Sequence, residues 1–203
     1  MIKIERTDVF GWESAIRGMR NPMNSWDKSD SICINKNHWD IGENDLKLMK
    51  SLSNAGNDHG KFLRFITVSA DITAPLYWWK EFDTYKVGTV ANSCSTMHKI
   101  HAKEFTLDDF SHEHLTPLST AVLIRVVDML NNYRADFTLT KSKNDWWQMI
   151  QLLPTSYNQR RTVQLNYQVL KSMYHARLHH KLDEWREFCD WIETLPYAEL
   201  IKK

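Results

Sequence analysis

Residues 161–178 have the sequence RTVQLNYQVLKSMYHARL, and a change of periodicity within this stretch decides the fold class. From Arg161 to Asn166, polar and apolar side chains alternate, which is typical of a strand with one buried face. Apolar side chains then recur at helical spacing and predict a helix over residues 169–178. They are Val169, Leu170, Met173, Tyr174 and Leu178. A strand followed directly by such a helix favours a sheet that packs against helices.

Strand and helix patterns also occur on both sides of this stretch. Strands are predicted at residues 2–6 and 62–68, the second continuing in alternation to Ile72. Helices are predicted at 44–55 with Asn44 as N-cap, and at 118–134, 145–153 and 182–192. Another is predicted to start at Thr73-Ala74-Pro75, with Thr73 as the N-cap candidate and Pro75 in the first turn. Residues 86–100 are rich in hydroxyl side chains, which predicts a polar loop. We therefore expect one α+β domain over residues 1–203, with much helix.

The charge balance, the cysteine spacing and the hydropathy indicate which classes of protein this sequence does not belong to. Lysine and arginine number 26 against 25 acidic residues, so the formal net charge is +1. This argues against a nucleic-acid binder, which usually carries a basic excess. Cys33, Cys94 and Cys189 lack the spacing of a disulfide framework or a zinc finger, which favours a reducing, cytoplasmic setting. No stretch approaches 18 uninterrupted apolar residues, so we expect no membrane association.

Motifs that would assign a reaction directly are absent from the sequence. It contains no GxGxxG, GxxxxGK[ST], HExxH or GxSxG pattern. Near pairs occur among the nine histidines, such as His112 with His114, His98 with His101, and His175 with His179. Two imidazoles alone do not complete a tetrahedral ligand set, and pairs arise by chance among nine residues. We therefore expect no metal site.

Three further features have both a functional and a structural interpretation. Cys94 in its polar loop is either a thiolate nucleophile or, as we favour, a small buried thiol. Tyr77-Trp78-Trp79 either stacks on a flat ligand or, as we favour, belongs to the core. The basic region with Arg160, Arg161 and Arg177 suits a phosphate or carboxylate ligand as well as it suits a solvated helix face.

Several segments, taken in order, are similar to a known family. Ala15-Ile16-Arg17 resembles that family's N-terminal A-x-R stretch, and Ala74-Pro75 opens an aromatic helix as in the family. Thr84-Tyr85-Lys86 stands where the family has R-H-R, and Ser95 stands near its phosphate-binding serine, with Cys94 there if the loop shifts by one residue. The C-terminal match is better: it includes Leu153-Pro154, Arg160, Asn166, Leu170 and Arg177. The chain thus resembles the flavin-dependent thymidylate synthases along most of its length.

The sequence departs from the family pattern at several ligand positions. Ile150 stands where the family has a nucleotide-binding arginine, and Thr96 or Met97 replaces the arginine of its signature loop. Gln168 and Ser172 replace an arginine and an asparagine that contact the flavin. Each lost arginine contact is worth about 1.5–3 kcal/mol, so nucleotide binding requires compensation. The candidates for compensation are Lys80, Lys86, Lys99 and Arg161.

The resemblance implies a fold, an activity and a set of site residues. It implies an α+β subunit with a small, mostly antiparallel sheet, in a homotetramer whose sites are built from several subunits. The implied reaction is the reductive methylation of dUMP or a related pyrimidine nucleotide, with FAD as cofactor and NADPH and methylene-tetrahydrofolate as co-substrates. Ser95 and Arg177 are the implied catalytic and nucleotide-binding residues, with Arg161 as a further nucleotide ligand. The implied flavin contacts are His59, Lys86 and Asn166.

Two other functions remain open at this point. The altered signature loop is compatible with a protein on the same scaffold that has lost catalysis and binds a nucleotide. A purely structural role in an assembly is the third alternative.

Overall fold

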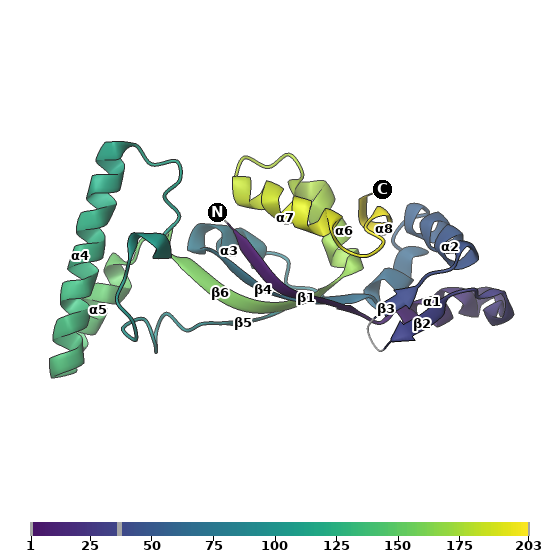
Figure 1. The fold of residues 1–203 in the computed structure, drawn as a ribbon, viewed down its shortest axis with the longest axis horizontal. Coiled ribbons are helices and arrows are strands. Elements are labelled where there is room, and N and C mark those ends of the chain that lie inside the picture. The colour runs from purple at the N-terminus through teal and green to yellow at the C-terminus, as the bar shows by residue number, and fades with distance from the viewer. Residues whose placement is uncertain (1, 36–37, 203) are drawn as a thin grey trace. The chain divides into compact units, whose positions relative to one another are not determined.

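The computed structural model describes residues 2–35 and 38–202 and contains two sheets with helices around them (Figure 1). The strands are β1 (Lys3–Phe10), β2 (Ile32–Asn35), β3 (His38–Asp40), β4 (Thr67–Pro75), β5 (Val90–Ser93) and β6 (Asn158–Asn166). The α-helices are α1 (Trp12–Arg20), α2 (Glu43–Asn54), α3 (Leu76–Phe82), α4 (Pro117–Thr140), α5 (Lys143–Leu152), α6 (Tyr167–Arg177), α7 (Asp183–Glu193) and α8 (Glu199–Lys202). Short 3-10 helices are η1 (Asn21–Met23), η2 (Trp26–Lys28), η3 (Gly60–Arg64) and η4 (Leu107–Asp109).

The chain divides into two compact units. Unit 1 contains residues up to Lys3, Thr73–Thr84 and Asn92–Arg161, and unit 2 contains Ile4–Ile72, Tyr85–Ala91 and Thr162–Lys203. The units are therefore interleaved along the sequence rather than consecutive. The expectation that residues 1–203 form a single domain stays a prediction.

The larger sheet is small and antiparallel, as predicted. Its strand order is β1-β4-β6-β5, and β2 and β3 form a separate two-stranded sheet. In unit 2, the Tyr167 N–H donates to the Ile66 carbonyl over 3.0 Å, next to the start of β4 and the end of β6. In unit 1, the Leu76 N–H donates to the Tyr157 carbonyl over 3.0 Å, at the opposite ends of the same two strands. β4 and β6 therefore run in opposite directions, which together with the helices confirms the α+β class.

Unit 1 is built around two packed helices, α4 and α5. Thr116 caps α4 by accepting a hydrogen bond from the Ser119 N–H, and Pro117 occupies the first turn, where its missing N–H costs nothing. The two helices enclose an apolar cluster. Its buried members are Ile100, Phe105, Phe110, Leu123, Val127, Leu130 and Met149. In the same unit, Trp78 and Trp79 of helix α3 are fully buried, which confirms that these two rings belong to the core, while Tyr77 is half-buried.

Unit 2 has α6, α7 and α8 on one side of its strands (Figure 1). Val163 and Leu165 of β6 are buried while Thr162 and Gln164 are exposed, which is the alternation found in the sequence. Of the predicted face of helix α6, Leu170, Met173 and Tyr174 are buried, while Val169 and Leu178 are half-buried. Helix α7 buries Trp185, Phe188, Cys189 and Ile192.

A buried ion pair joins α1 to α2 in unit 2. Arg20 Nε donates to Asp45 Oδ1 over 2.6 Å, and both side chains are almost inaccessible to solvent. The hydroxyls of Ser29 and Ser31 donate to Asp45 Oδ2 over 2.7 and 2.6 Å. Burial by itself raises the pKa of Asp45, but these hydrogen bonds and the Arg20 charge outweigh it, so the pKa lies below its ordinary value.

The structure corrects the strand that was predicted at residues 62–68. Residues Gly60–Arg64 form η3, and the strand begins only at Thr67. Phe62, Leu63 and Ile66 are buried while Arg64 and Phe65 are exposed, a spacing that suits a helical turn and not a strand. β-Branched and aromatic content indicated a strand, but packing decided otherwise.

Three smaller predictions also differ from the structure. The predicted polar loop at 86–100 contains β5, an edge strand whose four residues are all exposed. Gly42, not Asn44, is the N-cap of α2, and the Asp30 carboxylate accepts from the Asn44 N–H over 2.8 Å. Pro75, not Thr73, precedes α3. Within residues 2–35 and 38–202, no helix combines the length and apolarity needed to cross a bilayer.

Candidate functional site

Helix α6 of unit 2 carries two of the predicted site residues, one at each end. Asn166 is the N-cap, and its Oδ1 accepts a hydrogen bond from the Val169 N–H over 3.0 Å. Arg177 is the last residue of the helix. The Tyr167 and Val169 N–H groups of the first turn are already engaged, so it is the helix dipole that makes the Asn166 end favourable for an anionic group.

The segment that includes predicted Lys86 lies along this helix. Arg177 Nε donates to the Tyr85 hydroxyl over 3.0 Å. At the other end, a Cβ on Gly88 would come within 3.0 Å of Val169 and 3.1 Å of the Asn166 amide nitrogen. Gly88 has φ +79°, a backbone conformation that favours glycine, and the close neighbours leave no room for a side chain. Tyr85 and Gly88 therefore place the exposed Lys86 beside α6.

Two aromatic rings hold the Arg177 guanidinium. Its carbon lies 4.7 Å from the centre of the Trp185 ring and 5.6 Å from the centre of the Tyr85 ring. Such cation–π contacts, together with the hydrogen bond to Tyr85, restrict the rotamers of the side chain. Sequence reasoning identified Arg177 but missed Tyr85 and Trp185 as its partners, because they lie 92 and 8 residues away in the chain.

Asn166, the N-cap of α6, borders a pocket of about 310 Å³, here called the α6 pocket. It is lined by Thr67, Gly88, Thr89, Val90, Gln164, Leu165 and Asn166. Predicted His59 is exposed just before η3, and Asn57 of the same segment accepts a hydrogen bond from Gln168 over 3.1 Å. Unit 2 thus brings the segments of His59, Lys86 and Asn166 to the same end of α6.

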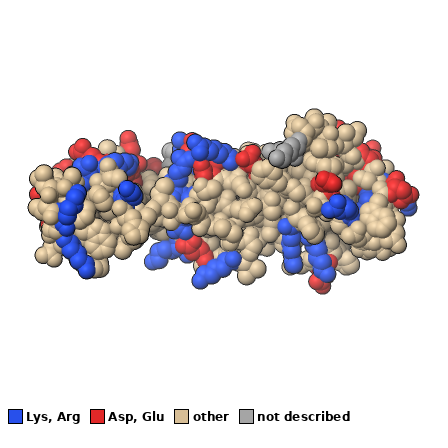
Figure 2. All heavy atoms as spheres, turned by 90° about the horizontal axis from the view of Figure 1, so that it is seen from below, with Lys and Arg blue, Asp and Glu red and all other residues tan. Residues whose placement is uncertain are grey.

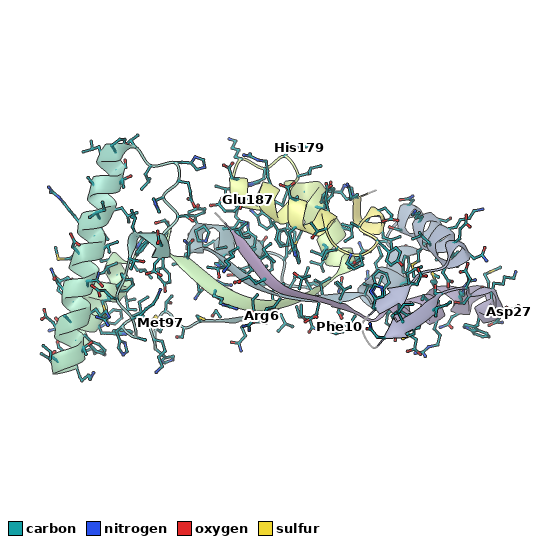
Figure 3. The ribbon with its side chains drawn as sticks, viewed as in Figure 1. Arg6, Phe10, Asp27, Met97, His179 and Glu187 are labelled. Carbon is teal, nitrogen blue, oxygen red and sulfur yellow. The ribbon has the colours of Figure 1, made fainter. Side chains whose placement is uncertain are left out.

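Predicted Ser95 belongs to unit 1, where it lines a larger pocket of about 660 Å³, here called the unit 1 pocket. Ser95 Oγ accepts from the His98 N–H over 3.0 Å, and the Trp146 indole donates to the Met97 carbonyl over 3.0 Å. These bonds fix the turn that follows β5, where Met97 is labelled in Figure 3. Because the Ser95 oxygen accepts the His98 bond, its own proton can still donate to a ligand.

Predicted Arg161 does not line either pocket. Its Nη1 lies 2.7 Å from Asp83 Oδ1, and its guanidinium carbon lies 4.2 Å from the centre of the Trp79 ring. The neighbouring Arg160 lines the unit 1 pocket instead. The alternation of side chains along β6 places the two arginines on opposite faces of the strand. Arg161 shares a face with the buried Val163 and Leu165, and Arg160 lies on the other face.

Cys94 also lines the unit 1 pocket and is exposed, so the expectation of a buried thiol is wrong. It follows the exposed edge strand β5, and its main chain pairs with Arg160, which leaves the side chain outside the core. Burial and the nearby Asp109 and Cys94 raise the pKa of the Tyr157 phenol in the same pocket. The described residues contain no cluster of three or more histidine, cysteine or acidic side chains that could hold a metal ion.

Charge is mixed rather than segregated on the surface. On the face seen in Figure 2, basic and acidic side chains are interspersed. The unit 1 pocket has the same character, because Lys3, Lys99, Lys103 and Arg160 line it together with Asp108, Asp109 and Glu113. This arrangement suits a ligand with both an anionic group and hydrogen-bond donors.

No protein-family model and no curated protein sequence matches the chain. Solved structures do match it. A crystal structure of the flavin-dependent thymidylate synthase ThyX from Helicobacter pylori, complexed with FAD and dUMP, is 17% identical, covers 98% of each chain and has a TM-score of 0.72. A second structure of that enzyme with FAD and dUMP is 16% identical over 100% of this chain and 97% of that chain, also with a TM-score of 0.72.

A third match is a UMP/dUMP methylase, PolB from Streptomyces cacaoi, bound with 5-Br UMP. It is 13% identical, covers 98% of this chain and 90% of that chain, and has a TM-score of 0.64. At these identities the likeness concerns the fold. The resemblance found in the sequence is confirmed at that level: this chain has the fold of the flavin-dependent thymidylate synthases.

Proposed function

We propose that this protein binds FAD and a pyrimidine nucleotide and catalyses reductive methylation of that nucleotide, dUMP or UMP, with NADPH and methylene-tetrahydrofolate as co-substrates. The observation that carries the proposal is the arrangement around α6, on a fold shared over almost the whole chain with an enzyme complexed with FAD and dUMP. Asn166 and Arg177 lie at the two ends of α6, and the separate segment that contains Lys86 lies beside this helix.

The residues around the α6 pocket fit part of a flavin dinucleotide. The polar residues of the lining are Thr67, Thr89, Gln164 and the N-cap Asn166, which suit a phosphate or the polar edge of a ring. Its volume of about 310 Å³ holds only part of a dinucleotide, so the rest must lie outside it. Asn166 would offer its amide nitrogen, and Lys86 and His59 would approach from the flanking segments. FAD supplies hydride transfer, and the protein supplies binding and orientation.

The nucleotide contacts that we propose are Ser95 and Arg177. Arg177 is held by Tyr85 and Trp185, so little rotamer freedom is lost when it binds a phosphate or a carbonyl oxygen. Ser95 sits in a fixed turn with its hydroxyl proton able to donate. Arg161 would first have to give up its ion pair with Asp83, which makes it the weaker candidate.

A homotetramer is part of the same proposal. Leu118, Val122 and Met129 of α4 have exposed fractions of 78%, 56% and 46%. Apolar side chains exposed along one long helix are typical of an interaction surface. The molar mass in solution, measured by light scattering after gel filtration, tests this, and a monomer of 24.0 kDa would refute it.

The decisive experiment combines a spectrum with an assay. Purified protein is incubated with FAD, freed of unbound cofactor by gel filtration, and examined for a flavin band. The same sample is then given NADPH, methylene-tetrahydrofolate and [5-³H]dUMP or [5-³H]UMP, and release of tritium is measured. A retained flavin and tritium release support the proposal. A colourless protein without tritium release refutes it.

A second candidate function, a catalytically inactive nucleotide binder, is favoured by the surroundings of two residues. Ile150, at a position where the resemblance expects an arginine, packs against the apolar cluster of unit 1. Gln168, at another such position, is engaged with Asn57. Nucleotide binding without flavin retention would support this second function over the first.

A further inference from the structure

Unit 2 contains a pocket to which neither the family resemblance nor the proposed function assigns a ligand. It has a volume of about 360 Å³ and is here called the α1 pocket. Ile16, Arg17 and Arg20 of α1 line it together with Trp26 of η2 and Trp39 of β3. The volume lies near the lower end of the usual range of small-molecule sites, so it suits a ligand with a small ring system.

Two indole rings and an aliphatic side chain form the apolar part of the α1 pocket. Trp26 remains 50% exposed, whereas Ile16 is buried. The Trp26 indole N–H donates to Asn21 Oδ1 over 2.8 Å, which fixes the orientation of the ring. Asp27, the next residue of η2, is labelled in Figure 3. A large, oriented and exposed ring beside a pocket is suited to packing against a planar ligand.

Trp39 is held in place through its main chain, and its indole N–H is left for a ligand. Trp39 pairs with Cys33 across the β2-β3 sheet. The Tyr197 hydroxyl donates to the Trp39 carbonyl over 3.3 Å and accepts from the Ile41 N–H over 2.8 Å. Within residues 2–35 and 38–202, the Trp39 indole N–H has no hydrogen-bond partner. The α1 pocket therefore has a positioned ring with an available donor.

Arg20 supplies a second donor, although its side chain is only 5% exposed. A guanidinium has five N–H groups. Nε donates to Asp45, Nη1 donates to the Ser25 carbonyl and hydroxyl over 3.1 and 3.5 Å, and Nη2 donates to the Lys28 carbonyl over 3.0 Å. In the described part of the chain, these bonds leave one Nη2 hydrogen without a partner. A buried donor is costly to leave unpaired, so the pocket favours a ligand with an acceptor.

The charges around the α1 pocket favour an acceptor that is negatively charged. Arg17 and Arg20 are cationic, and among the described residues that line the pocket Glu13 is the only acid. Glu13 and Arg17 lie 3.7 Å apart and are 69% and 64% exposed, so their pair is weak and Arg17 can turn to a ligand. Asp45 balances Arg20 from outside the lining, and its Oδ2 already accepts four hydrogen bonds from the protein.

We propose that the α1 pocket binds a small aromatic carboxylate. Its ring packs on Trp26, Trp39 and Ile16, and its carboxylate accepts hydrogen bonds from the Trp39 indole and from Arg20 Nη2. Arg17 adds positive charge from the exposed surface of α1. The inference is independent of the proposed function, because it uses none of the residues that are proposed to contact the flavin or the nucleotide.

The test is isothermal titration of the full chain with indole-3-acetate, indole-3-acetamide and 3-methylindole. The three probes share one ring, which carries a charged acceptor, a neutral acceptor or no acceptor. We expect indole-3-acetate to bind tightest and indole-3-acetamide to bind about 10-fold more weakly, because hydrogen bonds to charged groups are the stronger ones. 3-Methylindole should bind more weakly than either.

Two substitutions separate the donor and the charge from the apolar wall. Trp39→Phe keeps a ring but removes the N–H, so it should weaken indole-3-acetate binding about 10-fold and 3-methylindole binding much less. Arg17→Gln should weaken indole-3-acetate binding about 2- to 5-fold and leave indole-3-acetamide binding unchanged, because only the charge is lost. The matched control is Trp147→Phe, which alters an exposed tryptophan of α5 that does not line the α1 pocket. It should leave the binding of all three probes unchanged.

Arg20 is tested together with Asp45, since removing either alone leaves a buried charge unpaired. In Arg20→Met with Asp45→Leu, indole-3-acetate should bind about 10-fold more weakly, because the second donor is lost. Circular dichroism shows whether each variant folds. If Trp39→Phe or this double variant does not fold, Arg17→Gln on the exposed surface of α1 still provides the comparison.

Three outcomes would overturn the inference. The first is that the wild type binds none of the three probes at millimolar concentration. The second is that 3-methylindole binds as tightly as indole-3-acetate, which would leave no role for the carboxylate. The third is an unchanged affinity for indole-3-acetate in folded Trp39→Phe, which would place the ligand elsewhere. The flavin spectrum and the tritium assay do not depend on these results, so the inference and the proposed function can fail separately.

Discussion

Replacing Asp45 with asparagine should destabilise unit 2 strongly. The side chain is inaccessible to solvent and accepts hydrogen bonds from Arg20, Ser29 and Ser31. Asp45→Asn keeps the size of the side chain but removes its charge, and the amide nitrogen cannot accept from these donors. The Arg20 guanidinium then remains buried without a counter-charge.

The magnitude follows from that uncompensated charge. Removing one partner of a buried ion pair costs about 3–5 kcal/mol. Asparagine retains one acceptor oxygen, so we expect a loss near the lower end, about 3 kcal/mol. Replacing both partners, in Arg20→Met with Asp45→Leu, removes the buried charges together and should recover a large part of this loss.

Urea unfolding followed by circular dichroism, at a series of pH values, provides the assay. The pKa of Asp45 is lowered in the folded protein. The ionised carboxylate therefore contributes its full share to the free energy of unfolding above the ordinary aspartate pKa, and this share is lost as pH falls through the lowered pKa. Protonated aspartic acid and asparagine are both neutral. The difference between wild type and Asp45→Asn should therefore be large at pH 7 and shrink in strong acid.

Two results would refute this reasoning. One is a loss at pH 7 no larger than that of the control Asp58→Asn, an exposed carboxylate expected to change stability by less than about 0.5 kcal/mol. The other is a difference between wild type and Asp45→Asn that does not change between pH 7 and strong acid.

Three further predictions concern α6 and its neighbours. Asn166→Ala should lower the free energy of unfolding by about 1 kcal/mol through loss of the cap, whereas Asn166→Asp keeps the acceptor and the stability. Both variants should bind FAD more weakly in a fluorescence titration, and unchanged FAD binding would contradict the proposed contact between Asn166 and the flavin. Gly88→Ala should cost about 1–2 kcal/mol in urea unfolding, because φ is +79° and Val169 is too close, and a negligible loss would mean that the segment moves aside. Tyr85→Phe keeps the ring but loses the hydroxyl that accepts a hydrogen bond from Arg177, so it should weaken nucleotide binding only when Arg177 is present. A double-mutant cycle with Arg177→Ala measures this coupling, and additive effects on the affinity would argue against it.

The helices and strands that could be predicted from the sequence are those that bury one face and expose the other. β6 shows the alternation of Val163 and Leu165, and α6 shows a helical stripe, because each buries one face. β5 has no buried face, since all four residues are exposed at the edge of the sheet. Main-chain pairing alone defines such a strand, and side-chain patterns do not reveal it.

The 3-10 helix η3 shows a different limit. Phe62, Leu63 and Ile66 have strand-like composition, but their burial follows the spacing of a turn. The strand preference of a residue largely measures how well its side chain fits a half-buried surface. It therefore does not predict a strand correctly where the same side chains can be buried on one side of a helical turn.

For the candidate site, the sequence indicates the local positions of residues but not their non-local contacts, and the roles of the site residues stay predictions. The roles proposed for Asn166 and Arg177 come from the family resemblance, and the structure adds that the two residues lie at opposite ends of one helix. The contact between Tyr85 and Arg177 depends on a chain reversal that no local pattern encodes. Between Arg160 and Arg161, the alternation of β6 already separated the faces, but only the structure shows which face borders a pocket.

Helix α6 also acts as a spacer of fixed length. It has 11 residues, so its two ends lie about 16 Å apart along the axis at a rise of 1.5 Å per residue. Loops can adjust their reach to a ligand, but a helix packed on several sides cannot. A compact ligand therefore contacts either the Asn166 end or the Arg177 end, and only an extended one contacts both. Inserting or deleting a single residue in α6 would also rotate one end against the other by about 100°, so the length of this helix is expected to tolerate no change.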